Sequence, residues 1–339
     1  MTILKKYKDL SEINPANIVK KIKLNDTMLL NGNVKHLCEI KKDRTLIVGI
    51  NNENNNKDEL YIFKKIEENK EKFVPQFSKE ENSKIISLKV LNNENLLILN
   101  ENQFEVRETS ETANSLKTIQ NIKLEQEDER FIDVIELING NLVSISYSIA
   151  NENKNNIIFW NKNIMKGIYE IYKEIPKKEK PIKILEINKE KFVVLFENNI
   201  LYCYNSKNGD ENELPKIDNP ITFKKMIKIP EDGILFIDNK NYLLFSITSL
   251  QQKSFHGDFS ITDICYINNF NNYFFASFSQ ENNHGFLLLK IDLNKYKMHY
   301  KLYKLDAHPL KINCIYNLKK WDVITCSDDK TIKIWNLKL

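Results

Sequence analysis

The chain has 339 residues, of which 42% are hydrophobic and 10% aromatic, so it is long enough to bury a large core and does not have the composition of a disordered chain. Its 50 basic and 46 acidic side chains leave a net charge of +4, and both signs are interleaved along the chain. A nucleic-acid binder usually concentrates basic residues on one surface, so this balance argues against nucleic acid as a partner.

The cysteines and the N-terminus bear on the compartment. Five cysteines are scattered without a CxxC pair, so they form neither a disulfide framework nor a zinc knuckle and favour a reducing compartment. The N-terminal segment is charged and lacks the apolar core of a signal peptide, and no stretch approaches the roughly 18 apolar residues of a membrane span. We expect a cytoplasmic protein without membrane insertion, with the nucleus and a cytoskeletal or ciliary assembly left open.

A weak pattern recurs seven times along the chain: an alternating strand, a polar turn, a more apolar strand, another turn and a third strand. The first strands are 34–40, 85–91, 131–137, 182–187, 223–229, 261–267 and 312–318. Their starts lie roughly 40 to 50 residues apart, which is the spacing of a four-stranded propeller blade. The apolar runs are short and follow a period of two, which favours strands over a helical array.

The fourth strand of each unit is harder to identify, as expected for a solvent-exposed outer strand. The clearest candidate is 297–305, whose apolar and polar residues alternate strictly, and 116–122 and 164–171 are weaker candidates. Asn-rich and Asp-rich turns join many second and third strands, because these residues tolerate the positive φ of tight hairpins.

These units predict an all-β fold in which residues 1–339 form one domain, a single seven-bladed β-propeller of four-stranded blades. The blades start near residues 34, 85, 131, 182, 223, 261 and 312, and eight blades are the alternative if two units have been merged. The last unit has only three strands, so residues 17–24 are expected to supply its fourth strand and to close the ring. Deletion of residues 1–24 is therefore expected to destabilise the protein.

The last unit carries the clearest motif. Ala307-His308 stands at a Gly-His position, 327–331 is a tight turn, and Trp335-Asn336 stands at a Trp-Asp position. Residues 307–337 therefore resemble a WD40 repeat, while the other units resemble it only in architecture.

The WD40 resemblance implies a buried hydrogen-bond network inside the last blade. By position its members are His308, Cys326, Asp329 and Trp335. A thiol stands there in place of the family's Ser or Thr, and because a thiol is a weak donor and acceptor we expect the network to be weakened at that point. These residues are expected to be structural and not catalytic, since a nucleophile inside a blade is buried.

The same resemblance implies a rigid platform that binds other proteins, so we expect a non-enzymatic interaction scaffold, a subunit of a larger multiprotein complex. One alternative is a receptor that delivers bound proteins to a ubiquitin ligase or another effector. An alternative of a different class is a propeller enzyme with its site in the central channel, although the first strands carry few His, Asp or Glu side chains. We expect no metal and no cofactor, because the histidines lack ligand spacing and no glycine-rich phosphate loop is present. The sequence gives no obvious signal for a homo-oligomer.

Polar loops on one predicted face are candidates for a partner-binding rim. They are an acidic run with Glu125, Glu127, Asp128 and Glu129, a basic run with Lys177 and Lys178, and Asn-rich hairpins with Asn153, Asn155, Asn282 and His284. Adjacent patches of opposite charge can steer a partner during association. The simpler interpretation is that these are solvated loops and low-complexity Asn expansions.

Overall fold

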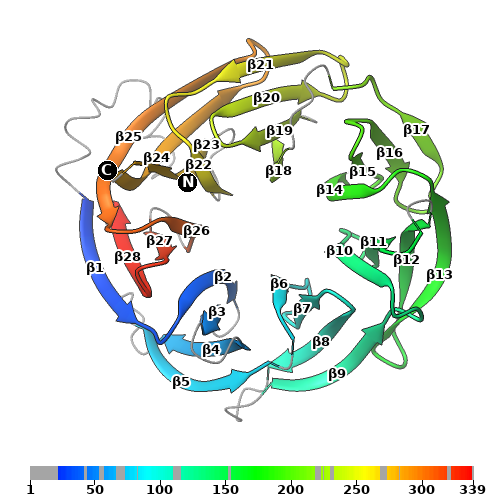
Figure 1. The fold of residues 1–339 in the computed structure, drawn as a ribbon, viewed down its shortest axis with the longest axis horizontal. Coiled ribbons are helices and arrows are strands. Elements are labelled where there is room, and N and C mark those ends of the chain that lie inside the picture. The colour runs from blue at the N-terminus through cyan, green and yellow to red at the C-terminus, as the bar shows by residue number, and fades with distance from the viewer. Residues whose placement is uncertain are drawn as a thin grey trace, which may run out of the picture. The chain divides into compact units, whose positions relative to one another are not determined.

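The computed structural model describes residues 22–337 apart from 42–43, 53–56, 66–72, 82, 110–115, 152–153, 218–222, 224, 230–232, 268–272, 282 and 319–321. The described residues form 28 strands and no helix, and none of them belongs to a helix long and apolar enough to cross a membrane. These strands make seven four-stranded antiparallel sheets, the blades of the propeller (Figure 1). The predicted all-β, seven-bladed fold is confirmed.

Blades 1 to 6 are meanders whose strands follow one another in sequence, from an inner first strand to an outer fourth strand. Blade 1 consists of β2 (Asn33–Ile40), β3 (Thr45–Asn52), β4 (Lys57–Lys65) and β5 (Phe73–Glu80). Blade 2 consists of β6 (Ile85–Val90), β7 (Leu96–Asn100), β8 (Gln103–Thr109) and β9 (Leu116–Lys123). Blades 3 and 4 consist of β10 (Glu129–Glu136), β11 (Leu142–Ser148), β12 (Asn155–Asn163) and β13 (Ile168–Lys177), and of β14 (Pro181–Asn188), β15 (Lys191–Phe196), β16 (Leu201–Asn205) and β17 (Glu211–Glu213).

Blades 5 and 6 repeat this order, whereas blade 7 takes its fourth strand from the N-terminal part of the chain. Blades 5 and 6 consist of β18 (Lys225–Ile229), β19 (Gly233–Asp238), β20 (Asn241–Ser246) and β21 (Gln252–His256), and of β22 (Ile261–Tyr266), β23 (Tyr273–Gln280), β24 (Asn283–Asp292) and β25 (Lys297–His308). Blade 7 consists of β26 (Ile312–Asn317), β27 (Asp322–Ser327), β28 (Thr331–Leu337) and, as its fourth strand, β1 (Ile22–Leu29).

Burial explains why the second strands were the easiest to recognise. All five residues of β7 are buried, because both faces of a central strand are covered and the strand becomes a continuous apolar run. The outer strand β13 is mostly exposed and alternates, as an edge strand does. The predicted start of that strand at 164 is wrong: residues 164–167 form the turn, in which Gly167 has φ of 68° and its N–H donates to the carbonyl of Asn163.

The N-terminal strand completes the last blade, as predicted. β1 pairs antiparallel with β28, from Ile22 opposite Leu337 to Leu29 opposite Thr331. The pairing strand covers 22–29 where 17–24 was expected, and residues 17–21 lie outside the described residues.

The chain divides into two compact units, each of which has its own core. Unit 1 comprises residues 1–35, 67–72 and 259–339, with β1 and β22 to β28, and unit 2 comprises residues 36–66 and 73–258, with β3 to β21. Buried side chains of blades 6 and 7, among them Phe275, Phe286 and Trp335, form one cluster of unit 1. In unit 2 the clusters bridge neighbouring blades, as where Phe104 of blade 2 packs edge-on against Phe131 and Trp160 of blade 3.

Five inner strands share a β-bulge at the same place, near their first residue. The register shifts between residues 85 and 87, 131 and 133, 181 and 183, 261 and 263, and 312 and 314. Bulges redirect side chains and recur beside functional sites. The residues that follow the bulge include Asp133, Lys183 and Asp263, so this position places polar groups on the inner strands.

Candidate functional site

A cavity of about 620 Å³ opens between loops of blades 3 and 4, within unit 2. Three segments form its walls: the hairpin between β11 and β12, the connection from β13 to β14, and the hairpin between β15 and β16. The lining residues are Tyr147, Ser148, Ile149, Asn155, Lys178, Glu179, Lys180, Glu197 and Asn198. This volume lies within the range of about 300–1,000 Å³ that is usual for small-molecule sites.

Lys180 is the best-placed charged group of this cavity. Its ammonium lies 4.2 Å from the centre of the Tyr147 ring and 3.2 Å from the Glu197 carboxylate. A cation over the face of an aromatic ring is attracted by the ring quadrupole, so the phenol and the carboxylate together hold the ammonium against the wall. Lys178 and Ile149 are exposed beside it and leave a wall of mixed polarity.

Hydrogen bonds between the three segments keep the cavity preformed. The Glu197 N–H donates to the carbonyl of Lys180 (3.0 Å), and the buried Asn155 side chain donates to the carbonyl of Lys178 (2.9 Å). The Ser148 hydroxyl donates to Asp128, whose carbonyl accepts the N–H of Ile149 (2.9 Å). Because every wall is tied to a neighbour, little ordering is needed when a ligand binds.

An ionic cluster connects the inner strands of blades 2, 3 and 4. Asp133 of β10 is almost completely buried and lies 2.6 Å from the Lys89 ammonium of β6 and 3.0 Å from the Lys183 ammonium of β14. Lys89 also donates to the carbonyl of Val134 (2.6 Å). Burial opposes the ionisation of Asp133, but the charges of Lys183 and Lys89 outweigh it and hold the pKa of Asp133 at about 2. Two part-exposed lysines thus share one buried carboxylate.

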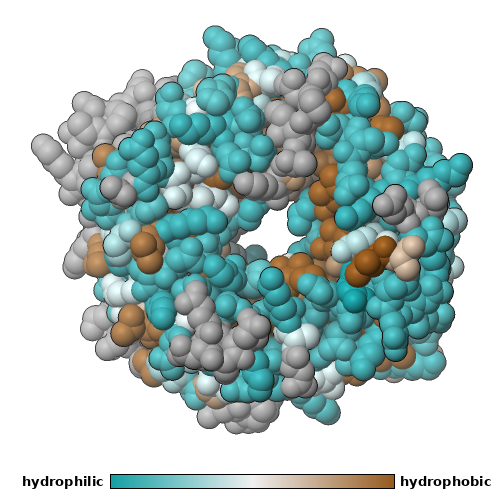
Figure 2. Space-filling model, in the orientation of Figure 1, coloured by the Kyte–Doolittle hydropathy of each residue, from teal (hydrophilic) through white to brown (hydrophobic). Residues whose placement is uncertain are grey.

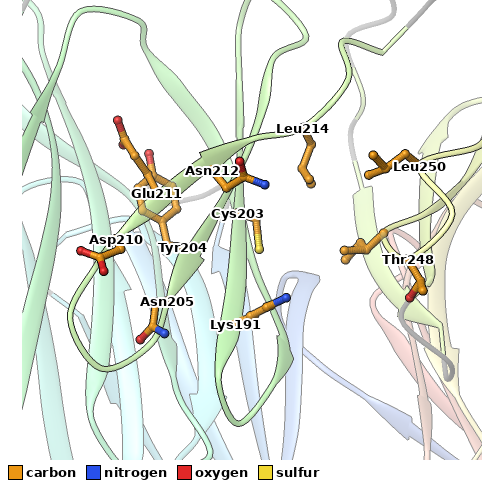
Figure 3. Close-up of a pocket in the computed structure, with 11 residues that line it drawn as sticks. Lys191, Cys203, Tyr204, Asn205, Asp210, Glu211, Asn212, Leu214, Thr248 and Leu250 are labelled. Atoms are coloured by element: carbon orange, nitrogen blue, oxygen red, sulfur yellow. The ribbon is translucent and has the colours of Figure 1, made fainter.

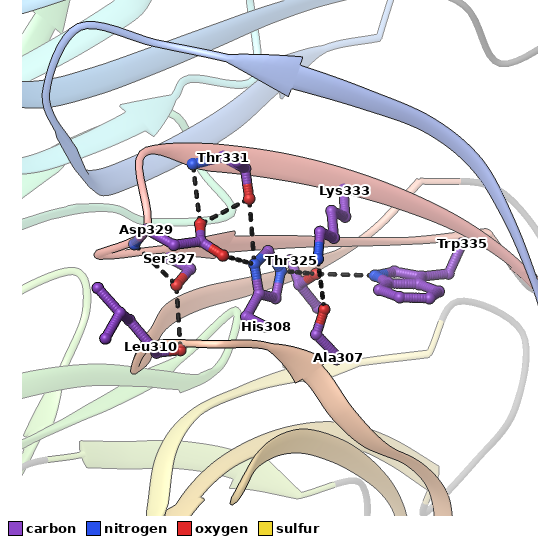
Figure 4. A network of polar contacts seen from close by, with 9 residues as sticks. All are labelled: Ala307, His308, Leu310, Thr325, Ser327, Asp329, Thr331, Lys333 and Trp335. Atoms are coloured by element: carbon purple, nitrogen blue, oxygen red, sulfur yellow. Dashed lines mark hydrogen bonds and ion pairs between the residues drawn. The ribbon is translucent and has the colours of Figure 1, made fainter. Parts of the chain in front are cut away.

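The hydrogen-bond network predicted for the last blade is present, with one different member (Figure 4). His308 Nδ1 lies 2.8 Å from Asp329 Oδ2, and His308 Nε2 lies 2.7 Å from the Thr325 hydroxyl. The Trp335 indole N–H donates to the same hydroxyl at 2.8 Å. The His308 Nδ1–H therefore donates to the Asp329 carboxylate, the Thr325 O–H donates to Nε2, and the Thr325 oxygen accepts from the Trp335 N–H. This arrangement satisfies every group when His308 is neutral. Burial lowers the pKa of His308, although its bond to Asp329 opposes the shift.

The predicted place of Cys326 in this network is wrong. Thr325 supplies the hydroxyl, and successive residues of a strand point to opposite faces, so the side chain of Cys326 leaves the network. The expected weak link is absent from this blade, because the position is held by a hydroxyl that both donates and accepts. A similar bond exists in blade 3, where Trp160 donates to the Ser144 hydroxyl at 2.9 Å.

The structure brings together part of the predicted rim. Lys178 and Asn155 line the cavity, Asp128 binds its hairpin, and Glu129 lies 3.1 Å from Lys154 of the same hairpin. The remaining members lie elsewhere or face solvent: Glu125 and Glu127 are exposed, Lys177 covers the rings of Tyr202 and Tyr204, and His284 binds Ser279 in unit 1. Asn153 and Asn282 lie outside the described residues.

Sequence reasoning missed Tyr147 and Lys180 as a pair. Lys180 belongs to the basic run 177–180, but only the structure shows that its partner is an aromatic residue 33 positions earlier. In the sequence, Tyr147 stands between Ser146 and Ser148 at the alternating end of β11. The structure shows that it is the half-buried residue of an otherwise buried strand.

A second cavity of about 410 Å³ lies at the outer side of blades 4 and 5 (Figure 3). It is lined by Lys191, Cys203, Tyr204, Asn205, Asp210, Glu211, Asn212, Leu214, Ile247, Thr248 and Leu250. Tyr204 is fully buried and stacks on Phe192 at 5.2 Å, so this part of the lining belongs to the core of blade 4, whereas Asp210, Glu211 and Asn212 are exposed. The outer strand β17, which has only three residues, contributes Glu211 and Asn212 to the lining.

The described residues offer neither a metal-binding cluster nor a large hydrophobic surface on the face drawn in Figure 2. Among the residues that the structure describes, no group of three or more His, Cys, Asp or Glu side chains is placed to hold a metal ion. The face drawn in Figure 2 is largely hydrophilic, with hydrophobic residues in a few patches. Singly exposed hydrophobic residues such as Ile149 are normal on a protein surface.

Comparison with known proteins supports the fold and corrects the family. No protein-family model and no curated protein matches the chain. The selenomethionine-substituted virginiamycin B lyase from Staphylococcus aureus is similar to it, with a TM-score of 0.65 and 13% identity over 94% of this chain and 100% of the lyase. A catalytically inactive histidine-to-alanine variant of that lyase with quinupristin has a TM-score of 0.63 and 12% identity over 94% of this chain and 100% of the lyase. A streptogramin B lyase has a TM-score of 0.62 and 14% identity over 95% of this chain and 99% of the lyase.

These likenesses show the seven-bladed propeller fold. They overturn two expectations drawn from the last unit: the WD40 identity, because the structural neighbours are not WD40 proteins, and the non-enzymatic scaffold, because those neighbours are lyases. One well-formed repeat therefore misled the assignment of the whole chain. Neither the cytoplasmic location nor the nature of the partners is tested by these comparisons, and both stay predictions.

Proposed function

We propose that the chain binds a peptide-like small molecule in the cavity between blades 3 and 4. The observation that carries this proposal is the preformed lining of that cavity, in which Lys180 lies over Tyr147 and against Glu197. Two lysines and two glutamates balance each other there, together with two asparagines and exposed apolar surface. A ligand that offers amide donors and acceptors and an apolar face, as a short peptide does, matches this balance better than a strongly charged ligand.

Lyase activity on such a ligand is the second candidate function. The structural neighbours favour it, because they are lyases of virginiamycin B and streptogramin B and one of them was solved with quinupristin. One neighbour is inactive when a histidine is replaced by alanine. No histidine is found among the residues that line the cavity between blades 3 and 4, so a lyase reaction there needs another proton acceptor. For this reason we propose ligand binding first and catalysis second.

Titration calorimetry with virginiamycin B, quinupristin and a set of short amphipathic peptides tests the proposal. We expect measurable binding of at least one probe, and a loss of about tenfold in affinity, equivalent to about 1.4 kcal/mol, in K180M and in Y147L. The matched control is K295M, which removes an exposed lysine of unit 1. No binding by any probe, or equal affinity of K180M and the unmodified protein, contradicts the proposal.

Mass spectrometry of the bound probe separates the two candidate functions. A lyase cleaves a bond without adding water, so its products lack the mass that hydrolysis adds. Cleavage in the unmodified protein that is lost in Y147L favours lyase activity in this cavity. Recovery of an intact probe leaves the protein as a binder.

A further inference from the structure

Two cysteines of blade 7 lie directly opposite each other on paired strands. Cys314 of β26 is the register partner of Cys326 of β27. Opposite residues of an antiparallel pair project to the same face with their Cα atoms about 4.5–5.5 Å apart, which falls inside the range of about 4.4–6.8 Å that a disulfide needs. Both cysteines are free.

The other cysteines do not share this arrangement. Cys203 lies opposite Val193 and Asn212, and Cys265 lies opposite Phe275. Cys38 belongs to the inner strand of blade 1, in unit 2, and is buried. Cys314 and Cys326 therefore differ from Cys203 and Cys265, because each of them lies opposite another cysteine.

We propose that Cys314 and Cys326 form a redox-active pair that a low-molecular-weight disulfide, such as glutathione disulfide, converts into a disulfide within blade 7. One cysteine thiolate attacks glutathione disulfide, its S–S bond breaks, and one glutathione leaves. The second thiolate attacks the mixed disulfide and releases the second glutathione. The two cysteines lose two electrons and two protons, and the two glutathione molecules gain them.

Burial sets the rate of this reaction. Cys326 is fully buried and Cys314 nearly so, and burial raises the pKa of the Cys326 thiol, so the thiolate is scarce in the closed blade. The first attack therefore requires the ladder between β26 and β27 to open. Once one thiol has reacted, its partner is already opposite, and the second step is intramolecular.

The disulfide joins β26 to β27 next to Thr325, which holds His308 and Trp335 in place. Closing the loop between residues 314 and 326 restricts the unfolded chain and stabilises the blade. Oxidation therefore fixes the arrangement of the last blade, and reduction restores the opening of its ladder.

The test uses the full chain, incubated with glutathione disulfide at low urea concentrations that permit local opening, then alkylated and digested. We expect a cross-linked peptide containing Cys314 and Cys326, and a melting temperature higher by roughly 5 °C that returns on addition of dithiothreitol. C314A and C326A each remove the cross-link and the shift. C203A and C265A are matched controls that keep both.

The proposal is overturned if glutathione remains attached to either cysteine without a cross-link, if both thiols stay unmodified, or if Cys265 takes the place of one partner. A cross-linked protein with an unchanged or lower melting temperature overturns the stabilising role. Since C314A and C326A each abolish the pair, one folded variant is sufficient for the comparison. Failure of this test does not touch the ligand site of blades 3 and 4, which lies in unit 2.

Discussion

Blades 2 and 7 use different chemistry at equivalent positions. In both blades the inner strand has its bulge after the first residue, Ile85 or Ile312. Four residues before that strand stands Glu81 in blade 2 and His308 in blade 7. The third strand carries Arg107 opposite Leu96 in one blade and Trp335 opposite Val323 in the other. The ladder thus aligns Glu81 with His308 and Arg107 with Trp335.

The partners at these positions form networks of opposite character. Arg107 donates two hydrogen bonds of 2.6 Å to the two oxygens of Glu81 and one of 2.9 Å to Glu105, and all three side chains are buried. In blade 7 a neutral imidazole and an indole take the places of Glu81 and Arg107, and the Thr325 hydroxyl on the second strand joins them, with Asp329 at the end of this chain of hydrogen bonds (Figure 4). In both blades a satisfied polar connection joins the loop before the inner strand to the third strand, and the two blades make it with different chemistry.

Breaking the charged network should have the largest effect. R107M leaves two buried carboxylates without their cation, so we expect a loss of about 3–5 kcal/mol in the free energy of unfolding, measured by urea denaturation. The double variant R107M/E81M leaves only one buried carboxylate and should be more stable than R107M. If R107M unfolds at the urea concentration of the unmodified protein, the ion network does not stabilise blade 2.

Breaking the network of blade 7 should lower the free energy of unfolding by less than breaking that of blade 2. T325V keeps the shape of the side chain but orphans His308 Nε2 and the Trp335 N–H, so we expect a loss of about 3 kcal/mol by the same measurement. C326A is the matched control one residue further along, since Cys326 is outside the network, and it should cost less than T325V. The reverse order would restore the role that the sequence assigned to Cys326.

The comparison also shows what could be predicted from the sequence. The inner strands were placed within about two residues, because alternation and turn residues report the local structure of a strand directly. The network of blade 7 was found because His308 and Trp335 resemble a known motif. The network of blade 2 was not, since Glu81, Glu105 and Arg107 look like ordinary surface charges in a chain where 28% of the residues are charged. Only burial distinguishes them.

The candidate site was predicted less well for the same reason. Lys178 and Asn155 were among the expected loop residues. Tyr147 and Lys180 were not predicted to be neighbours, because they lie on two segments that are distant in the sequence and come together only in the folded chain. The misplacement of Cys326 has a different cause. The motif fixes the positions of His308 and Trp335, whereas the hydroxyl between them depends on which face of β27 looks inward, and an error of one residue inverts the face.

The smallest of the three expected effects on the free energy of unfolding is that of acid on buried ionisable groups. The pKa of Asp133 falls from 3.8 to about 2 in the folded chain, so its ionised form contributes stability that is present above pH 3.8 and is lost as the pH falls towards 2. The shift corresponds to about 2 kcal/mol. His308, whose pKa is lowered, contributes stability that is present above its unfolded pKa of 6.5 and begins to be lost as the pH falls below that value.

D133N removes the contribution of Asp133 to the lower window, to which Asp328 and Asp329 of blade 7 also contribute because their pKa values are lowered. Its urea midpoint should lie below that of the unmodified protein at pH 5, and the two midpoints should converge between pH 4 and pH 2, because protonation removes from the unmodified protein the charge that the variant already lacks. T325V serves as the control, since it retains Asp133 and should keep the decline between pH 4 and pH 2. Parallel curves for D133N and the unmodified protein over this range would mean that Lys89 and Lys183 do not stabilise the ionised carboxylate of Asp133.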